Sequence, residues 1–436
     1  MGFALTVCYI VLTIISPGQF GPAVVDYHLM QVLAGVICAV SLPELLGHKH
    51  VWSSVQALLL LGFSLAIALS QAANGWLGGA VQSWVLFLPA VSVFFFIVAN
   101  VTTLRRLRIL VRAIVGACLF VAVEAMFGYY AGFGGDTFVL QRAIYFHDRV
   151  VMHFPQIRGI GFLNDPNDFA QILIVALPLV FVFWRRRRLA DNLLLALVPS
   201  ALLLWAIYLT HSRGALLGLA VLALMAIRTK LPTTLSIVLV AALVMTMLAF
   251  DFAGGRGISI SDGEDRLEAW SNGLQMFKSA PVFGVGFGAF PEHNNYLTAH
   301  NSLVLCLAEL GLVGSTVWVA LLVTTALGLN SIMRPQTPQK PSDDQDQTPA
   351  AKKKKSLVPP HWIMAVHLSL VSFIATSWFL SRSYSITMYL ILGLATATIA
   401  IQRSAGKIRD HKRWVLLTIT TEAAAILFIY GVVRLR

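Results

Sequence analysis

Five basic side chains could do chemistry together, although they are spread along an otherwise apolar chain. They are Arg158, Arg213, Arg266, His300 and Arg382. Guanidinium groups bind phosphate oxygens in bidentate fashion and keep their charge at neutral pH. A histidine titrates near neutral pH and can take a proton from a hydroxyl group. This set of residue types suits group transfer from a diphosphate-linked donor to a hydroxyl acceptor.

Each of these residues also has a structural interpretation. An arginine at the end of an apolar helix often extends to lipid phosphate groups. Arg266 follows three acidic residues between positions 262 and 265 and could form a local ion pair. His300 could cap or pack a helix. The functional interpretation therefore depends on the five residues acting as a group.

Membrane-spanning helices are the elements that would position these residues. Hydrophobic residues make up 57% of the 436 residues and charged residues 12%, against about 25% charged residues in a soluble domain. Apolar runs near the ~20-residue spanning length predict an all-α polytopic membrane protein with about 12–13 transmembrane helices. The runs cover approximately residues 3–20, 24–45, 52–70, 81–101, 108–131, 167–184, 191–210, 212–228, 232–252, 301–329, 361–381, 383–402 and 413–434.

The positions of lysine and arginine predict the orientation of these helices. Basic clusters follow alternate runs, at residues 105–108, 185–188, 228–230, 352–355 and 403–413. Because cytoplasmic loops carry the excess of basic residues, we expect these clusters and the N-terminus in the cytoplasm. The five candidate residues then lie at the outer ends of helices. Basic loops beside anionic lipid also account for the net charge of +12, so no nucleic-acid partner is expected.

Three long connections divide the chain. Residues 132–166 and 253–300 mix aromatic, glycine and charged residues, so we expect them to order on the outer side and carry function. Within the second, residues 266–280 have apolar side chains at helical spacing, which predicts an amphipathic helix near the membrane surface. The expected domains are N-terminal transmembrane helices at 1–131, a core at 132–329, a disordered cytoplasmic linker at 330–360 and C-terminal transmembrane helices at 361–436.

The segment GFLNDPNDFA precedes the sixth apolar run and reads as a turn followed by a helix. Pro166 fixes the backbone of the turn, and Asn167 or Asp168 is expected to cap the helix. Alternatively, Asn164 or Asn167 contacts sugar hydroxyls. Both interpretations stay open.

Cofactor motifs are absent from the sequence. The G-V-G-F-G run at 284–288 lacks the full dinucleotide-binding pattern and a preceding strand, and no Walker sequence occurs. The four cysteines, which lie inside apolar runs without metal-like spacing, are expected to pack. We therefore expect neither a cofactor nor a metal.

Four segments together resemble the superfamily of O-antigen ligases and Wzy-type O-antigen polymerases, which are bacterial envelope glycan transferases. The segments are RGIGFLNDPNDFAQ at 158–171, SRGALLG at 212–218, DRLEAWSNGLQMFKSAPVFGVGFGAF at 265–290 and AHNSLVLCLAELGLVG at 299–314. In the last segment His300, Asn301, Gly311 and Gly314 stand at the positions of the family signature.

The resemblance implies an inverting, metal-independent glycosyltransferase of the GT-C type with a helical periplasmic loop. It implies a place in the bacterial inner membrane, a site facing the periplasm and an undecaprenyl diphosphate-linked glycan as donor. Arg213 and Arg266 would hold the diphosphate, and His300 would act as base on the acceptor hydroxyl. The further candidates for substrate binding are Arg158, Asn301, Asn164, Asn167 and Arg382.

The acceptor decides between several related functions. We expect lipid A core, which makes the protein an O-antigen ligase. A further repeat unit would make it a polysaccharide polymerase, and a serine or threonine hydroxyl a protein O-glycosylation ligase. A different class, an anion transporter, would use the outer arginines to attract substrate and His300 to relay protons. That class predicts polar residues deep in several helices, and the chain has few, mainly Glu124 and Glu309.

Glu309 lies nine residues after His300 in the same apolar run. At ~3.6 residues per turn it would sit ~13 Å deeper and on the opposite side of the helix. It cannot orient His300 directly, so we expect a buried structural role for it.

Overall fold

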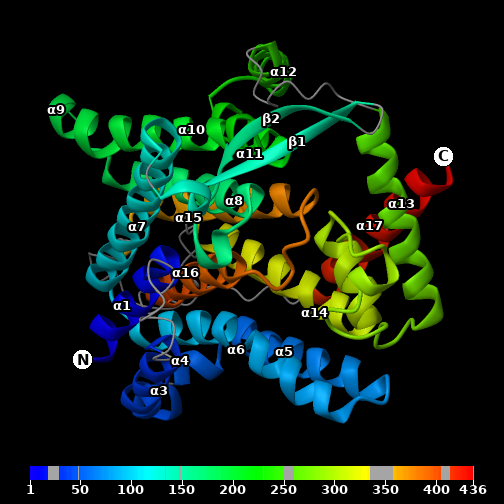
Figure 1. Cartoon of the computed structure of the whole chain (residues 1–436). Helices are drawn as coiled ribbons and strands as arrows, with labels where there is room; N and C mark the ends of the chain where they lie inside the picture. The colour runs from blue at the N-terminus through cyan, green and yellow to red at the C-terminus, as the bar shows by residue number, and fades with distance from the viewer. Residues whose placement is uncertain are drawn as a thin grey trace, which may run out of the picture.

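The computed structural model describes residues 1–17, 29–47, 49–132, 134–146, 149–185, 187–228, 230–249, 260–333, 357–403 and 413–435. In these ranges the chain is a bundle of helices with one two-stranded sheet (Figure 1). The helices are α1 Gly2–Ile15, α3 Leu29–Gly47, α4 Lys49–Trp52, α5 Val55–Ala73, α6 Leu77–Asn100, α7 Leu104–Ala131, α8 Pro166–Val180, α9 Leu189–Asn192, α10 Val198–Leu209, α11 Arg213–Ile227, α12 Thr233–Ala249, α13 Ile260–Ser279, α14 Ser302–Met333, α15 Pro360–Ser377, α16 Ile386–Arg403 and α17 Trp414–Arg434. The strands are β1 Val139–Phe146 and β2 Arg149–Ile157.

The helices identify a polytopic membrane protein, as expected. Every apolar run in the sequence corresponds to a helix, and 8 of the described helical segments are long and apolar enough to cross a membrane. Four further apolar helical stretches have 10–17 residues, fewer than the ~20 that a bilayer core needs: Gly2–Ile15, Leu29–Glu44, Arg213–Ile227 and Thr233–Met247. Within the described residues, length and composition thus give 8 candidate spans, with these shorter apolar helices in addition. Most of the linker expected at 330–360 lies outside the described residues.

Two arginine–aromatic contacts mark one end of the bundle. Arg108 of α7 lies 5.9 Å from the ring centre of Trp362 in α15, and Arg112 lies 5.9 Å from that of Phe183, which follows α8. A guanidinium near an aromatic ring is attracted to its π-face. The start of α7, the end of α8 and the start of α15 therefore lie together, at the end where the sequence has basic clusters.

The first long connection contains a β-hairpin, which the expectation of a wholly helical protein did not include. Val139 of β1 pairs with Ile157 of β2 in antiparallel register, with an irregularity between Ile144 and Tyr145. Both strands are rich in β-branched and aromatic residues, which favour extended backbone. The hairpin packs on α7 and α10 (Figure 1).

The amphipathic helix expected at 266–280 is confirmed by α13. Trp270 and Leu274, on its predicted apolar face, are buried. The helix packs against α14 and α17, which lie beside it in Figure 1. Arg266 falls in its first half and is thereby held on a packed helix rather than on a loop.

The long helix α14 is broken at Gly311, whose backbone has φ 61° and ψ −160°. The chain between α13 and α14 supplies hydrogen-bond partners for the backbone N–H and C=O groups that the break leaves unpaired. Its hydrogen bonds are Leu312 N to Pro281 O (2.9 Å), Val313 N to Val282 O (3.2 Å), Val285 N to Ala308 O (2.9 Å) and Gly286 N to Glu309 O (3.1 Å). A break inside a membrane span is tolerated only where other protein groups satisfy the freed backbone in this way.

Residues 281–290, which pack into the break, are also held by side chains of α5 and α14. Asn74 Nδ2 at the end of α5 donates to Gly284 O (2.9 Å), and Gln71 Nε2 donates to Phe287 O (2.7 Å). Glu309 Oε1 accepts from Phe290 N (3.1 Å), and the Glu309 residue is 1% exposed. The expected buried structural role of Glu309 is confirmed.

Candidate active site

His300 stands immediately before the first turn of α14. Its backbone is left-handed, with φ 50°, a conformation that costs energy for a residue with a side chain. The next residue, Asn301, caps the helix, because its Oδ1 accepts from Leu303 N (2.9 Å) and Val304 N (3.0 Å). Asn301 is fully buried. His300 is thus not the cap, and its imidazole is left for another use.

Residues 378–385, which we call the α15–α16 loop, hold this helix start in place. Asn301 Nδ2 donates to Trp378 O (3.1 Å), and Ser302 Oγ donates to Leu380 O (2.6 Å). Ser302 also accepts twice, through Oγ from Arg382 N (2.8 Å) and through its carbonyl from Ser383 Oγ (2.6 Å). Reasoning from the sequence identified only Arg382 in this loop. The run SWFLSRSYS, polar between two apolar helices, was the available signal.

The two arginines expected to bind a diphosphate also lie at the α15–α16 loop. Arg266 places its guanidinium 5.9 Å from the ring centre of Phe379. Arg213 is the first residue of α11, and its neighbour Gly214 packs closely against the loop. A Cβ added to Gly214 would lie 3.7 Å from the Leu380 side chain and 3.8 Å from that of Phe379. One loop therefore joins the starts of α11 and α14 to α13.

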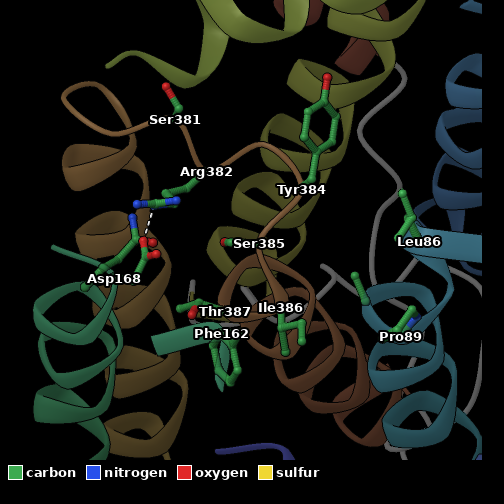
Figure 2. Close-up of a pocket in the computed structure, with 12 residues that line it drawn as sticks. Leu86, Pro89, Phe162, Asp168, Ser381, Arg382, Tyr384, Ser385, Ile386 and Thr387 are labelled. Atoms are coloured by element: carbon green, nitrogen blue, oxygen red, sulfur yellow. Dashed lines mark ion pairs between the residues drawn. The ribbon is translucent and has the colours of Figure 1, made fainter. Parts of the chain in front are cut away.

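Arg382 turns its guanidinium to the start of α8. Its Nε forms an ion pair with Asp168 Oδ1 (Figure 2). Its Nη2 lies 3.7 Å from Asp165 Oδ1. Asp165 caps α8 by accepting from Asn167 N (2.8 Å). The helix cap expected at Asn167 or Asp168 is therefore at Asp165, because the helix begins at Pro166 and its first N–H groups point back to that residue.

The surroundings of His300 lower the pKa of its imidazole below the usual value. Burial has the largest effect, since it disfavours the charged form, and the positive charges of Arg266 and Arg382 act in the same direction. Asp165 opposes them, and Arg142 adds a smaller lowering. The side chain is therefore neutral at neutral pH and has a nitrogen lone pair that can accept a proton.

A cavity of about 400 Å³ opens beside this group (Figure 2). Residues of α6, α8, the α15–α16 loop and the start of α16 enclose it. The lining residues are Leu86, Pro89, Ala90, Phe162, Asp168, Gln171, Ser381, Arg382, Tyr384, Ser385, Ile386 and Thr387. Of the residues singled out from the sequence as site candidates, Arg382 is the one that lines it.

Three other candidates are used in internal contacts. Arg158 donates to the backbone carbonyls of Asp136 (2.6 Å), Thr137 (3.3 Å) and Asn164 (3.4 Å), which ties the hairpin base to the turn before α8. Asn167 Oδ1 accepts from Ser212 Oγ (2.6 Å), which joins α8 to the start of α11. Asn164 is exposed and accepts through its carbonyl. We therefore assign Arg158 and Asn167, with Asn301, to holding the site together.

The structure thus gathers His300, Arg213, Arg266 and Arg382 around one loop. Three of them also share a family match: residues 198–319 match the sequence profile of the Wzy_C family, described as O-Antigen ligase. The matched range includes Arg213, Arg266 and His300 and ends before Arg382. No curated protein matches the chain.

Proposed function

We propose that the protein transfers a glycan from an undecaprenyl diphosphate-linked donor to a hydroxyl of lipid A core, because residues 198–319 match the O-antigen ligase family. The domain family supports membrane glycan transfer of the ligase or polymerase type from lipid-linked substrates. The choice of donor lipid and acceptor is ours. We place the protein in the bacterial inner membrane with the α15–α16 loop facing the periplasm, because the basic clusters lie at the other end of the helices.

The proposal depends on the place of His300, at a helix start held by the α15–α16 loop, which also carries Arg382 and contacts Arg266. Burial and the charges of Arg266 and Arg382 keep the imidazole unprotonated. A neutral imidazole is a general base, whereas a protonated one could only donate a proton. The positive charge of Arg266 also suits a diphosphate, which needs cations at its leaving oxygen.

In the proposed reaction Arg213 and Arg266 hold the donor diphosphate. The acceptor oxygen attacks the anomeric carbon of the glycan while its proton passes to His300. The bond between that carbon and the diphosphate oxygen breaks, and the electron pair leaves with undecaprenyl diphosphate. Attack opposite the leaving group inverts the anomeric centre, in the manner of a GT-C type glycosyltransferase.

We propose that the arginines stabilise the leaving diphosphate without a metal ion. Fixed positive charges placed where negative charge develops are worth most in a site with little water. Transfer should therefore be unchanged by EDTA. Activity that EDTA abolishes and a divalent ion restores would contradict this part of the mechanism.

A transfer assay with purified protein tests the assignment of residues. The wild type, His300→Ala, Arg213→Ala and Arg266→Ala receive lipid-linked glycan and lipid A core in the same membrane mimetic. Loss of a general base should lower the rate about 10²- to 10⁴-fold. Arg112→Ala is the matched control, because it removes an arginine that lies over Phe183 at the other end of the bundle. Equal rates in wild type and His300→Ala would refute the site.

A genetic test separates ligase from polymerase. If His300→Ala leaves long glycan on the lipid carrier but none on lipopolysaccharide, the protein is a ligase. If the long chains themselves disappear, it is a polymerase. Loss of glycan from a protein, with lipopolysaccharide intact, would instead identify a protein O-glycosylation ligase.

A further inference from the structure

The cavity beside Arg382 has two chemically different sides (Figure 2). Leu86, Pro89 and Ala90 of α6 form an apolar side, which Phe162 and Ile386 extend. Opposite them are hydroxyl groups of the α15–α16 loop and the start of α16, together with the Asp168–Arg382 ion pair. A sugar ring has the same two parts, because its C–H face is apolar and its edge carries hydroxyls.

The charges of the lining do not suit a diphosphate. The one arginine of the lining, Arg382, is paired with Asp168 of the lining, and Asp165, outside it, lies 3.7 Å from the same guanidinium. A diphosphate needs an excess of positive charge. Arg213 and Arg266, which we assign to the diphosphate, are not part of this lining. We therefore place the donor's charged group outside this cavity.

Two serine hydroxyls of the lining have no hydrogen-bond partner within the part of the chain that the structure describes. They are Ser381 Oγ and Ser385 Oγ, and both oxygens are shielded from solvent. Buried polar atoms are nearly always paired in native proteins, so each of these oxygens calls for a partner. A ligand with hydroxyl groups can supply one.

The α15–α16 loop connects this cavity to His300. The backbone N–H of Arg382 donates to Ser302 Oγ, two residues after His300, while its guanidinium lines the cavity. The charge of the same guanidinium also lowers the pKa of His300. A group held in the cavity is therefore next to the loop that positions the proposed base.

We propose that this cavity is the acceptor subsite and that it takes a neutral sugar ring which carries the attacked hydroxyl. The proposal rests on the proposed function and adds where the acceptor binds and which chemical class it belongs to. A volume of about 400 Å³ is at the small end of the range for small-molecule sites, roughly 300–1,000 Å³. Ser381, Ser385 and Thr387 bond the ring hydroxyls, and Asp168 and Arg382 fix its edge. The proton of the attacked hydroxyl passes to His300 as its oxygen bonds to the donor's anomeric carbon.

Bisubstrate kinetics with the purified full chain test the subsite. Ser385→Ala should raise the KM for lipid A core about 3- to 10-fold, the effect of one lost hydrogen bond, and leave the KM for lipid-linked glycan unchanged. Arg266→Lys should show the reverse. Ser369→Ala is the matched control, because its hydroxyl donates to Ala365 O within α15 and stands apart from the cavity lining. An acceptor KM unchanged in Ser385→Ala, with active wild type, would refute the subsite and leave the proposed function intact.

A labelling experiment measures binding without turnover. Ser385→Cys, and Ser381→Cys as a second position, are modified in lipid nanodiscs with methyl methanethiosulfonate, and mass spectrometry follows the new cysteine apart from Cys8 and Cys38, which are exposed. Lipid A core should slow the modification, whereas undecaprenyl diphosphate should not. Protection by undecaprenyl diphosphate alone assigns the cavity to the donor and overturns the proposal, as does protection by neither. If lipid A core protects the introduced cysteine but the wild-type protein transfers no glycan, the proposed function is refuted and the subsite is supported.

Discussion

Residue types predict some of the residues that surround His300 but not all of them. Arg213, Arg266 and Arg382 were identified because a guanidinium at the end of an apolar helix is unusual, and all three lie at the α15–α16 loop. For Asp168 the sequence predicts at most a helix cap, shared as a possibility with Asn167, since both residues follow a proline turn. The ion pair between Asp168 and Arg382 joins two distant parts of the chain, and no local pattern announces such a pair.

The rate of transfer should depend on pH through His300. Its pKa is lowered, so the neutral base is present at neutral pH, and activity should fall only as pH drops below the usual histidine value of about 6.5. Asp165 is the neighbour that raises this pKa. Asp165→Asn should therefore move the acid limb of the pH–rate profile to lower pH. Asparagine also caps helices, so α8 should be preserved.

A set of pH–rate profiles at saturating substrate checks this prediction. Circular dichroism of Asp165→Asn controls for the fold of α8. An acid limb that stays in place, or that moves to higher pH, would show that His300 is not the titrating base.

The helices were predictable as elements because apolar runs of spanning length depend on local sequence alone. The break in α14 was not, although Gly311 was noted as part of a family pattern. Its left-handed backbone follows from the passage of residues 281–286 across the helix, which is a tertiary fact. The β-hairpin was missed for a similar reason, since strand pairing inside a mixed loop has no hydropathy signal.

Gly311→Ala should destabilise the protein. An added Cβ would lie 2.4 Å from Val282 O, and the backbone conformation at Gly311 is one that other residues rarely adopt. The backbone strain alone is worth about 1–3 kcal/mol. Thermal unfolding of purified protein, followed by tryptophan fluorescence, should show a lower midpoint than the wild type.

Gly116→Ala provides the control for that measurement. Gly116 lies inside α7, and no atom stands within 4 Å of an added Cβ. Alanine has the higher helix propensity, so its midpoint should not fall. Equal midpoints for Gly311→Ala and Gly116→Ala would contradict the broken-helix geometry.

The whole molecule has two chemically different ends. One collects the arginine–aromatic contacts of α7 with α15 and with the end of α8. The other collects the starts of α8, α11 and α14 around the α15–α16 loop. The distribution of basic residues predicted which helix ends share a side. It could not predict which of them touch, because that depends on how the helices pack.

The proposed orientation can be checked with introduced cysteines. Leu297→Cys lies on the side of His300 and Leu189→Cys on the side of the basic clusters, and both native residues are exposed. In intact spheroplasts a membrane-impermeant maleimide should label position 297 but reach position 189 only after permeabilisation. The wild type controls for Cys8 and Cys38. The opposite pattern would invert the topology.

The order of synthesis follows from where the α15–α16 loop stands in the chain. Asn301 donates a hydrogen bond to Trp378, 77 positions later in the chain, and Ser302 donates one to Leu380, 78 positions later. At ~5–20 residues per second, a ribosome needs about 4–15 s to make that stretch. The nascent chain therefore has His300, the proposed base, before it has the loop that holds the start of α14. Glycan transfer should begin only after α15 has entered the membrane, so a half-made protein left in the bilayer cannot consume the lipid-linked donor.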